Sequence, residues 1–397
     1  MSKNMVKKPK KIETFDDEED EVEDTPASNS SDDAKRKMFK MMVIICGLMV
    51  GLLLFIYIAS LLSNKTYTYS DLEQIMKDAA VGYFGAHTEY LPTQEGKIVQ
   101  VDYTNLVYEE RMKDFSEYGA TCTGYVQVEK VGAEYVYTPY LNCGEDYATV
   151  ELYKKVLSDN SIVTSGYGLY SRDDSKIFRG EEVNNYVKLD NSLWRIVKIN
   201  SDNTMALIHN EGLHYSQAWD DRYNEDKLYN IGNNQYSTSR IKEFLNRIYT
   251  NPSEADKENI LSDHDKARVT SYSLCVGKRT QLSTKNNNSE ECSLTVKNTK
   301  LGLLTLSDYL TASLDPNCKN ATNKSCLNYN YLVIDGAWWL ATANKENTYS
   351  AFMVNDSGAV EVANASQFAK VRPVIYLSER ALFDKGTGTL TDPYTIR

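Results

Sequence analysis

Oxygen-bearing side chains that could bind a cation cluster in one short stretch of the sequence. Asp220, Asp221, Asn224 and Asp226 carry carboxylate or amide oxygens, which are the ligands that Ca²⁺ prefers. A solvated polar loop has the same composition, because such clusters are common without the geometry of a cation site. We expect no resident metal or other cofactor, and these four residues are the candidate if Ca²⁺ binds.

Large aromatic and basic side chains in apolar stretches are the candidates for ligand binding. Trp338 and Trp339 are adjacent, so in a strand their side chains point to opposite faces. An exposed tryptophan offers a platform to a sugar ring or a protein partner, whereas a buried one belongs to the core. Arg372 can bind an anionic ligand or pair internally with a carboxylate, and Trp194 and Arg195 carry the same two interpretations.

Signatures of catalysis are missing from the sequence. There is no GxSxG motif, no phosphate-binding loop and no CxxC pair, and the four histidines are dispersed. The adjacent acids Glu181-Glu182 and Glu290-Glu291 are interpreted as solvated charge, because a glycosidase needs two carboxylates brought together in a cleft. The net charge of −11 argues against nucleic-acid binding through a global positive field. The sequence therefore leans against an enzyme.

Six of the seven cysteines follow residue 65, and Cys46 lies in an apolar run. An even number of cysteines in an oxidising compartment favours disulfides. Nearest-neighbour pairing gives Cys122–Cys143, Cys275–Cys292 and Cys318–Cys326, although the sequence alone permits other pairings.

Residues 41–62 form a run without a charged residue. As a helix it would be about 33 Å long, enough to cross the hydrocarbon core of a bilayer. Lys35, Arg36, Lys37 and Lys40 precede the run, and Lys65 follows it. The positive-inside rule then predicts a single-pass signal anchor of the plasma membrane, with a cytoplasmic N-terminus and residues 65–397 outside. Residues 1–40 are rich in both charges and predict a disordered tail.

The remaining chain predicts an α+β protein in two parts joined by a linker. In the first part, 66–150, apolar spacing predicts a helix over 70–84, capped by Ser70 and Glu73, and a hairpin of strands 124–130 and 134–141. Residues 151–176 are assigned to the linker. In the second part, 177–390, alternation and helical spacing predict hairpins at 193–209 and 349–362, a helix over 237–249, and a short helix over 254–261.

Five sequence blocks in the second part, taken in order, resemble a large uncharacterised family of bacterial surface domains. That family is similar in fold to the C-type-lectin-like and formylglycine-generating-enzyme group, which implies short antiparallel strands under long loops and no settled activity. The Glu-Pro-Asn and Gln-Pro-Asp tripeptides of calcium-dependent lectins are absent, and no cysteine follows Cys326 to supply the enzyme's reactive pair. The blocks span residues 184–200, 237–249, 303–310, 338–344 and 371–377.

The first part resembles the head of pilin-like bacterial surface proteins, over about 100 residues. An apolar N-terminal helix, an amphipathic continuation and a small disulfide-closed sheet carry this resemblance, whereas the prepilin processing signal is absent. The sequence predicts a membrane-anchored recognition or adhesion protein that binds a glycan or a protein at the cell envelope. Two alternatives stay open, an enzyme acting on the cell wall or a glycan, and a structural component of a pilin-like system.

Overall fold

The computed structural model describes residues 30–62, 66–190, 192–252 and 260–397. The chain forms two units, Met1–Tyr67 and Thr68–Arg397. In the first unit, helix α1 (Ser30–Leu62) is long and apolar enough to cross a membrane. It begins at Ser30, so residues 30–40, expected in the disordered tail, are helical here. Residues 1–29 lie outside the described part of the chain.

The second unit starts with a new helix, α2 (Tyr69–Ala86). Thr68 has extended backbone angles and caps α2 in a reciprocal pair of hydrogen bonds with Asp71, so the expected cap at Ser70 and Glu73 was wrong. A helix running on unbroken from the apolar span is not formed, because residues 66–68 are not helical. The buried face of α2 carries Leu72, Met76, Ala79, Ala80 and Phe84, as its apolar spacing predicted.

An antiparallel sheet packs against α2, in the order β1 (Ile98–Asp102), β2 (Thr123–Val131) and β3 (Glu134–Asn142). The β2–β3 hairpin was predicted, and Gly132 lies in its turn at φ +61°. The Cys122–Cys143 disulfide closes the hairpin, as nearest-neighbour pairing predicted. Helix α3 (Tyr103–Tyr108) follows β1. Together α2 and β1–β3 are called the first module.

Residues 151–176 are not an irregular linker, which corrects the expectation from the sequence. They contain helix α4 (Leu152–Asp159) and strand β4 (Gly168–Arg172), which pairs with β5 (Ser175–Arg179). Strand β5 also pairs with β7 (Ser192–Ile199). The hairpin β4–β5 is therefore the edge of the large sheet.

The large sheet has eight strands and runs in the order β10-β18-β8-β7-β5-β4, with β13 on β18 and β6 on β7. The hairpin of β7 and β8 (Met205–His209) was predicted from alternation. The others are β6 (Tyr186–Leu189), β10 (Val269–Thr270), β13 (Gly302–Leu303) and β18 (Pro373–Leu377).

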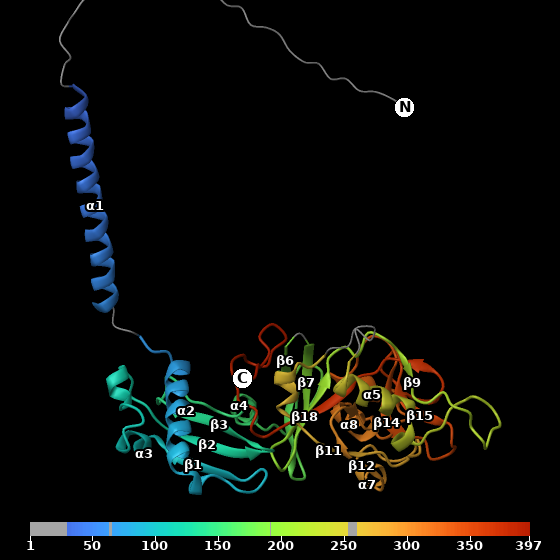
Figure 1. Ribbon diagram of the computed structural model, residues 1–397. Coiled ribbons are helices and arrows are strands. Elements are labelled where there is room, and N and C mark those ends of the chain that lie inside the picture. Colours follow the sequence, from blue (N-terminus) through green and yellow to red (C-terminus); the bar gives the residue numbers. More distant parts are fainter. Residues whose placement is uncertain (1–29, 63–65, 191, 253–259) are drawn as a thin grey trace, which may run out of the picture. The chain divides into compact units, whose positions relative to one another are not determined.

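We define the second module as residues 150–397. Besides the large sheet it contains a three-stranded sheet, two short strand pairs and surrounding helices (Figure 1). The strands of the three-stranded sheet are β14 (Trp338–Ala343), β15 (Ser350–Val354) and β16 (Val360–Asn364); the pairs are β9 (Gln217–Ala218) with β17 (Phe368–Ala369), and β11 (Tyr272–Cys275) with β12 (Thr295–Thr299). The helices are α5 (Arg240–Thr250), α6 (Asp263–Lys266), α7 (Asn288–Glu291) and α8 (Leu306–Ala312). The helix expected over 254–261 lies mostly outside the described residues.

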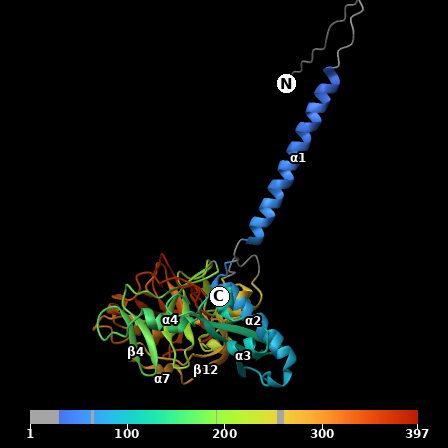
Figure 2. The ribbon, with the colours of Figure 1, turned by 90° about the vertical axis from the view of Figure 1, so that its left-hand side faces the viewer.

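The C-terminal residues connect the second module to the first. Arg397 binds Glu73 on α2, and Arg380 binds Glu129 on β2. Within the second module, Leu382 also forms a β-bridge with Glu151. The C-terminus consequently lies beside the first module in both views (Figures 1 and 2).

Candidate functional site

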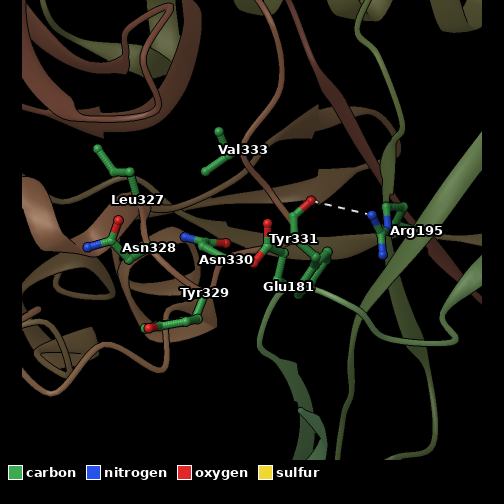
Figure 3. A pocket seen from close by; sticks show the side chains of 8 residues that line it. All are labelled: Glu181, Arg195, Leu327, Asn328, Tyr329, Asn330, Tyr331 and Val333. Atoms are coloured by element: carbon green, nitrogen blue, oxygen red, sulfur yellow. Dashed lines mark hydrogen bonds between the residues drawn. The ribbon is translucent and has the colours of Figure 1, made fainter.

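A pocket of about 650 Å³ opens in the second module. Arg195 enters it from β7 and Glu181 follows β5, whereas the other lining residues belong to the single segment 327–333. Figure 3 shows Arg195 at one end and Asn328 and Tyr329 at the other. The lining consists of Glu181, Arg195, Leu327, Asn328, Tyr329, Asn330, Tyr331 and Val333.

Segment 327–333 is fixed in place by a disulfide and a buried amide. The Cys318–Cys326 bridge, paired as predicted, immediately precedes it. The side chain of Asn330 donates to the carbonyls of Tyr309 and Cys326, both at 3.1 Å, and accepts from the Leu332 amide at 3.0 Å. Because Asn330 is buried and its amide is satisfied internally, it shapes the pocket rather than offering its polar atoms to a ligand.

Tyr329 stands at the mouth of the pocket in a strained backbone conformation. Its φ is +50° and the residue is 49% exposed. A bulky residue pays an energetic cost for positive φ, and such strain is often stored where a side chain must be aimed. Asn328 beside it is exposed, and its amide donates to Asp315 at 2.8 Å. The pocket thus presents an exposed ring and an exposed amide at its rim.

Arg195 is buried, with 7% of its surface exposed. Its Nε donates to Oδ1 of Asn185 at 2.8 Å, and its two terminal nitrogens donate to the carbonyls of Tyr331 at 3.4 Å and Val183 at 3.3 Å. The guanidinium lies 4.0 Å from the ring centre of Tyr186 and 4.7 Å from that of Tyr331. Within the described residues, no carboxylate pairs with this cation.

Arg372, predicted to bind a ligand, is completely buried and does not line the pocket. Its Nε donates to the carbonyl of His209 at 2.8 Å and its Nη1 to that of Leu332 at 2.6 Å, and the guanidinium lies 5.0 Å from the ring centre of Trp338. Burial and the neighbouring Arg195 lower the pKa of Arg372 to about 9. Direct contact with a surface ligand is therefore ruled out in this conformation, and its carbonyl partners replace the expected carboxylate.

Both tryptophans of β14 are fully buried, which rules out the expected exposed sugar platform. Trp338 packs edge-on against Tyr309, and the indole nitrogen of Trp339 donates to the carbonyl of Gln217 at 2.9 Å. The strand is covered on both faces, so alternation places neither side chain in solvent. Trp194 is also fully buried.

Three of the four candidate Ca²⁺ ligands bind protein partners, and the fourth, Asp226, is exposed. Asp220 is buried and both of its carboxylate oxygens accept from Arg222. Asp221 pairs with Arg240 at 3.1 Å, and Oδ1 of Asn224 accepts from the Lys227 amide at 3.1 Å. Across the described residues, no group of three or more His, Cys, Asp or Glu side chains is arranged to hold a metal ion.

Glu291 is not solvated, contrary to the interpretation of the Glu290-Glu291 pair. It is buried against Arg279, which is also buried, with 3.3 Å between Nη1 and Oε1. Ser307 and Thr342 donate to the same oxygen at 3.1 and 2.8 Å. Burial raises the pKa of the Glu291 carboxyl, while Arg279 opposes that rise. The third disulfide, Cys275–Cys292, follows directly in the sequence and is paired as predicted.

Two further pockets are less suited to specific recognition. One of about 500 Å³ lies on the first module near Tyr125 and Tyr140, and one of about 460 Å³ lies near Tyr272 and Tyr376. Neither is lined by a lysine or an arginine. The pocket at Arg195 combines a buried cation, an exposed aromatic ring and an exposed amide, so we treat it as the candidate site.

Sequence reasoning missed Tyr329 and Asn328, and it placed Glu181 in solvent without a role. The alternation of amide and aromatic residues over 328–331, directly after Cys326, is the pattern that could have drawn attention to the segment. Comparison with known proteins adds no assignment, since no protein-family model, curated protein or solved structure matches this chain. The lectin-like and pilin-like resemblances stay predictions.

Proposed function

We propose that this protein is a membrane-anchored, non-catalytic recognition protein that binds a glycan of the cell envelope in the pocket at Arg195. The observation that carries the proposal is Tyr329, a half-exposed ring held at φ +50° at the pocket mouth. Aromatic rings that combine an apolar face with a polar tip are suited to contact sugar rings. The adjoining amide and guanidinium supply hydrogen-bond donors that orient a polar ligand.

The anchor and the disulfides support a position at the cell surface. Helix α1 has the length and composition of a membrane span, and the basic residues Lys35, Arg36, Lys37 and Lys40 precede its apolar part. This charge pattern favours a cytoplasmic N-terminus. Three disulfides in the second unit are typical of an oxidising compartment.

The alternatives receive less support from the candidate site and from the helices. A glycosidase needs two carboxylates flanking the scissile bond, whereas among the described residues Glu181 is the one acid that lines this pocket. A pilin-like assembly would be favoured by a single helix through the apolar span and residues 70–84, and α2 instead begins at its own cap. Recognition is therefore the function we advance.

Full-length protein in lipid nanodiscs, probed with an array of envelope glycans, tests the proposal. We expect binding that Tyr329→Ala weakens about tenfold and Tyr329→Phe largely keeps, because ring stacking needs the aromatic face. Tyr229→Ala removes another exposed tyrosine, 66% accessible and outside the pocket, and should change nothing. We expect no dependence on Ca²⁺, since Asp220 is bound to Arg222. Absence of binding, or equal loss in the two alanine variants, would contradict the proposal.

A further inference from the structure

Two buried arginines of the second module hold positive charges that no described carboxylate neutralises. Arg195 and Arg372 are 7% and 0% exposed, and their hydrogen bonds go to carbonyl and amide oxygens. Buried charges are normally paired, since desolvation of an isolated ion is costly. Arg279, equally buried, has its carboxylate partner in Glu291. The first two arginines therefore form an incomplete site.

Arg195 retains unused donors at the pocket. A guanidinium has five N–H groups, and hydrogen bonds to Asn185, Tyr331 and Val183 occupy three of them. These three hydrogen bonds leave one N–H on each terminal nitrogen, and the Tyr186 side chain also interacts with the guanidinium. Two donors in one plane match the two oxygens of a carboxylate.

Arg372 adds positive charge directly behind the same segment. Arg195 and Arg372 donate to the consecutive carbonyls of Tyr331 and Leu332, within the segment that lines the pocket. Nη2 of Arg372 is buried and has no hydrogen-bond partner in the described part of the chain. Because Arg372 does not reach the pocket, it raises the local positive potential rather than touching the ligand.

A further cation, Arg179, ends β5 two residues before Glu181, which lines the pocket. Arg179 donates to the carbonyls of Thr311 and Ser313 at 2.9 and 3.1 Å. Burial, and then the charge of Arg179, lower the pKa of Lys285, while Asp315 opposes that change. Because Asp315 accepts from Asn328 at the opposite end of the pocket, the positive charge that would attract an anion is concentrated at the Arg195 end.

We propose that the ligand is an acidic saccharide and that Arg195 binds its carboxylate through the two unused N–H groups. This inference rests on the proposed function, because it assigns a chemical class to the ligand of the same pocket. Glu181 lies at the exposed rim and opposes an anion weakly, since water screens its charge. The buried guanidinium is less screened and dominates the recognition.

Oligosaccharides that carry either an ionised carboxylate or its uncharged methyl ester test the inference. Oligogalacturonate and its fully methylated ester are titrated at millimolar concentration into the full-length protein in nanodiscs. We expect the acid to bind about tenfold or more tightly than the ester. Arg195→Lys keeps a charge but loses the planar fork, so binding of the acid should weaken more than binding of the ester and most of the preference should be lost.

The matched control is Arg268→Lys. Arg268 also donates to backbone carbonyls, those of Arg397 and His264, and lies outside the pocket. Its substitution should leave the preference for the acid intact. The melting temperature of each variant confirms that the fold is kept.

Three results would overturn the inference. They are equal binding of acid and ester to the unmodified protein, an unchanged preference in Arg195→Lys, and tighter binding of a sugar phosphate than of the uronic acid. Equal binding that Tyr329→Ala weakens would leave glycan recognition standing and remove only the carboxylate. Failure of both compounds to bind would remove the carboxylate, whereas the proposed function is judged separately by the array with the Tyr329 variants.

Discussion

The second module contains two buried arginine sites that differ in one respect. Arg279 lies against Glu291, and its charge is balanced within the chain. Arg195, with Arg372 behind it, is held by carbonyls, an amide and aromatic rings, and opens on a pocket. The balanced pair has the character of a structural element, because its carboxylate also accepts from Ser307 and Thr342 on separate elements. The positive charge of Arg195 and Arg372 is therefore available to an anionic ligand that enters the pocket.

The largest expected effect comes from breaking the balanced site. Glu291→Gln leaves Arg279 buried without its anion, which should lower the free energy of unfolding by about 3–5 kcal/mol. Urea denaturation followed by tryptophan fluorescence measures this, since all four tryptophans are buried in this module. Glu290→Gln, one residue away and half-buried, is the control and should cost about 1 kcal/mol or less. Equal costs would mean that the ion pair does not hold the module together.

The pH dependence of stability probes the site of Arg195 and Arg372, because His209 lies against Arg372. Its carbonyl accepts from Arg372 and its ring packs edge-on against Trp194. Burial, and then Arg372, lower the pKa of His209 from 6.5 to about 4. The unfolded chain therefore takes up a proton at a higher pH than the folded chain.

The resulting stability is complete above pH 6.5 and is lost as the pH falls towards 4, by about 3 kcal/mol. In His209→Gln that part of the acid sensitivity should vanish, although other groups still titrate. Urea midpoints measured across this pH interval give the difference. Parallel curves for the two proteins would show that His209 is not held neutral.

Replacing each arginine in the ligand-free protein compares the two sites by their effect on the free energy of unfolding. Arg279→Met leaves Glu291 unpaired and should cost about 3–5 kcal/mol. Arg195→Met removes a cation that has no anion, so the lost hydrogen bonds are offset by the avoided desolvation and the net cost should be about 1 kcal/mol. Equal losses in urea denaturation would contradict the distinction between a structural and a ligand-binding arginine.

The smallest effect is expected at the rim of the pocket. Glu181→Gln removes an exposed acid that opposes an anionic ligand, and should tighten binding of oligogalacturonate about twofold at low salt. Titration calorimetry at low and high ionic strength would show the gain shrinking with added salt. Weaker binding in Glu181→Gln would instead indicate that the carboxylate accepts a hydrogen bond from the ligand.

Local patterns in the sequence predicted much of the fold. The β7–β8 hairpin follows from alternation over 193–209, helix α5 from the apolar face of Ile241, Phe244, Leu245 and Ile248, and the three disulfides from pairing of neighbouring cysteines. Residues 151–176 were misassigned because β5 joins the sheet through Lys176 and Ile177 opposite Ile199 and Lys198. Pairing between segments distant in sequence leaves no periodic pattern within either one.

The candidate site was harder to predict for a related reason. Whether Arg195 is a structural or a ligand-binding residue depends on the acceptors around it, and two of these are backbone carbonyls from Val183 and Tyr331. Every residue has a backbone carbonyl, so the residue types in the sequence do not predict which carbonyls will accept from Arg195. The rim is assembled from Glu181 and from segment 327–333, whose strained Tyr329 depends on the backbone geometry of the folded loop.

The contact between Arg397 and Glu73 has a mechanical consequence. Tension applied to the second module by a tethered ligand has two routes towards α2, one through the covalent chain at residue 150 and one through the C-terminal residues. The ion pair between Arg380 and Glu129 also connects the C-terminal residues to β2 of the first module. A load shared in parallel strains each connection less than a load carried in series. The two modules should therefore resist bending relative to each other under load.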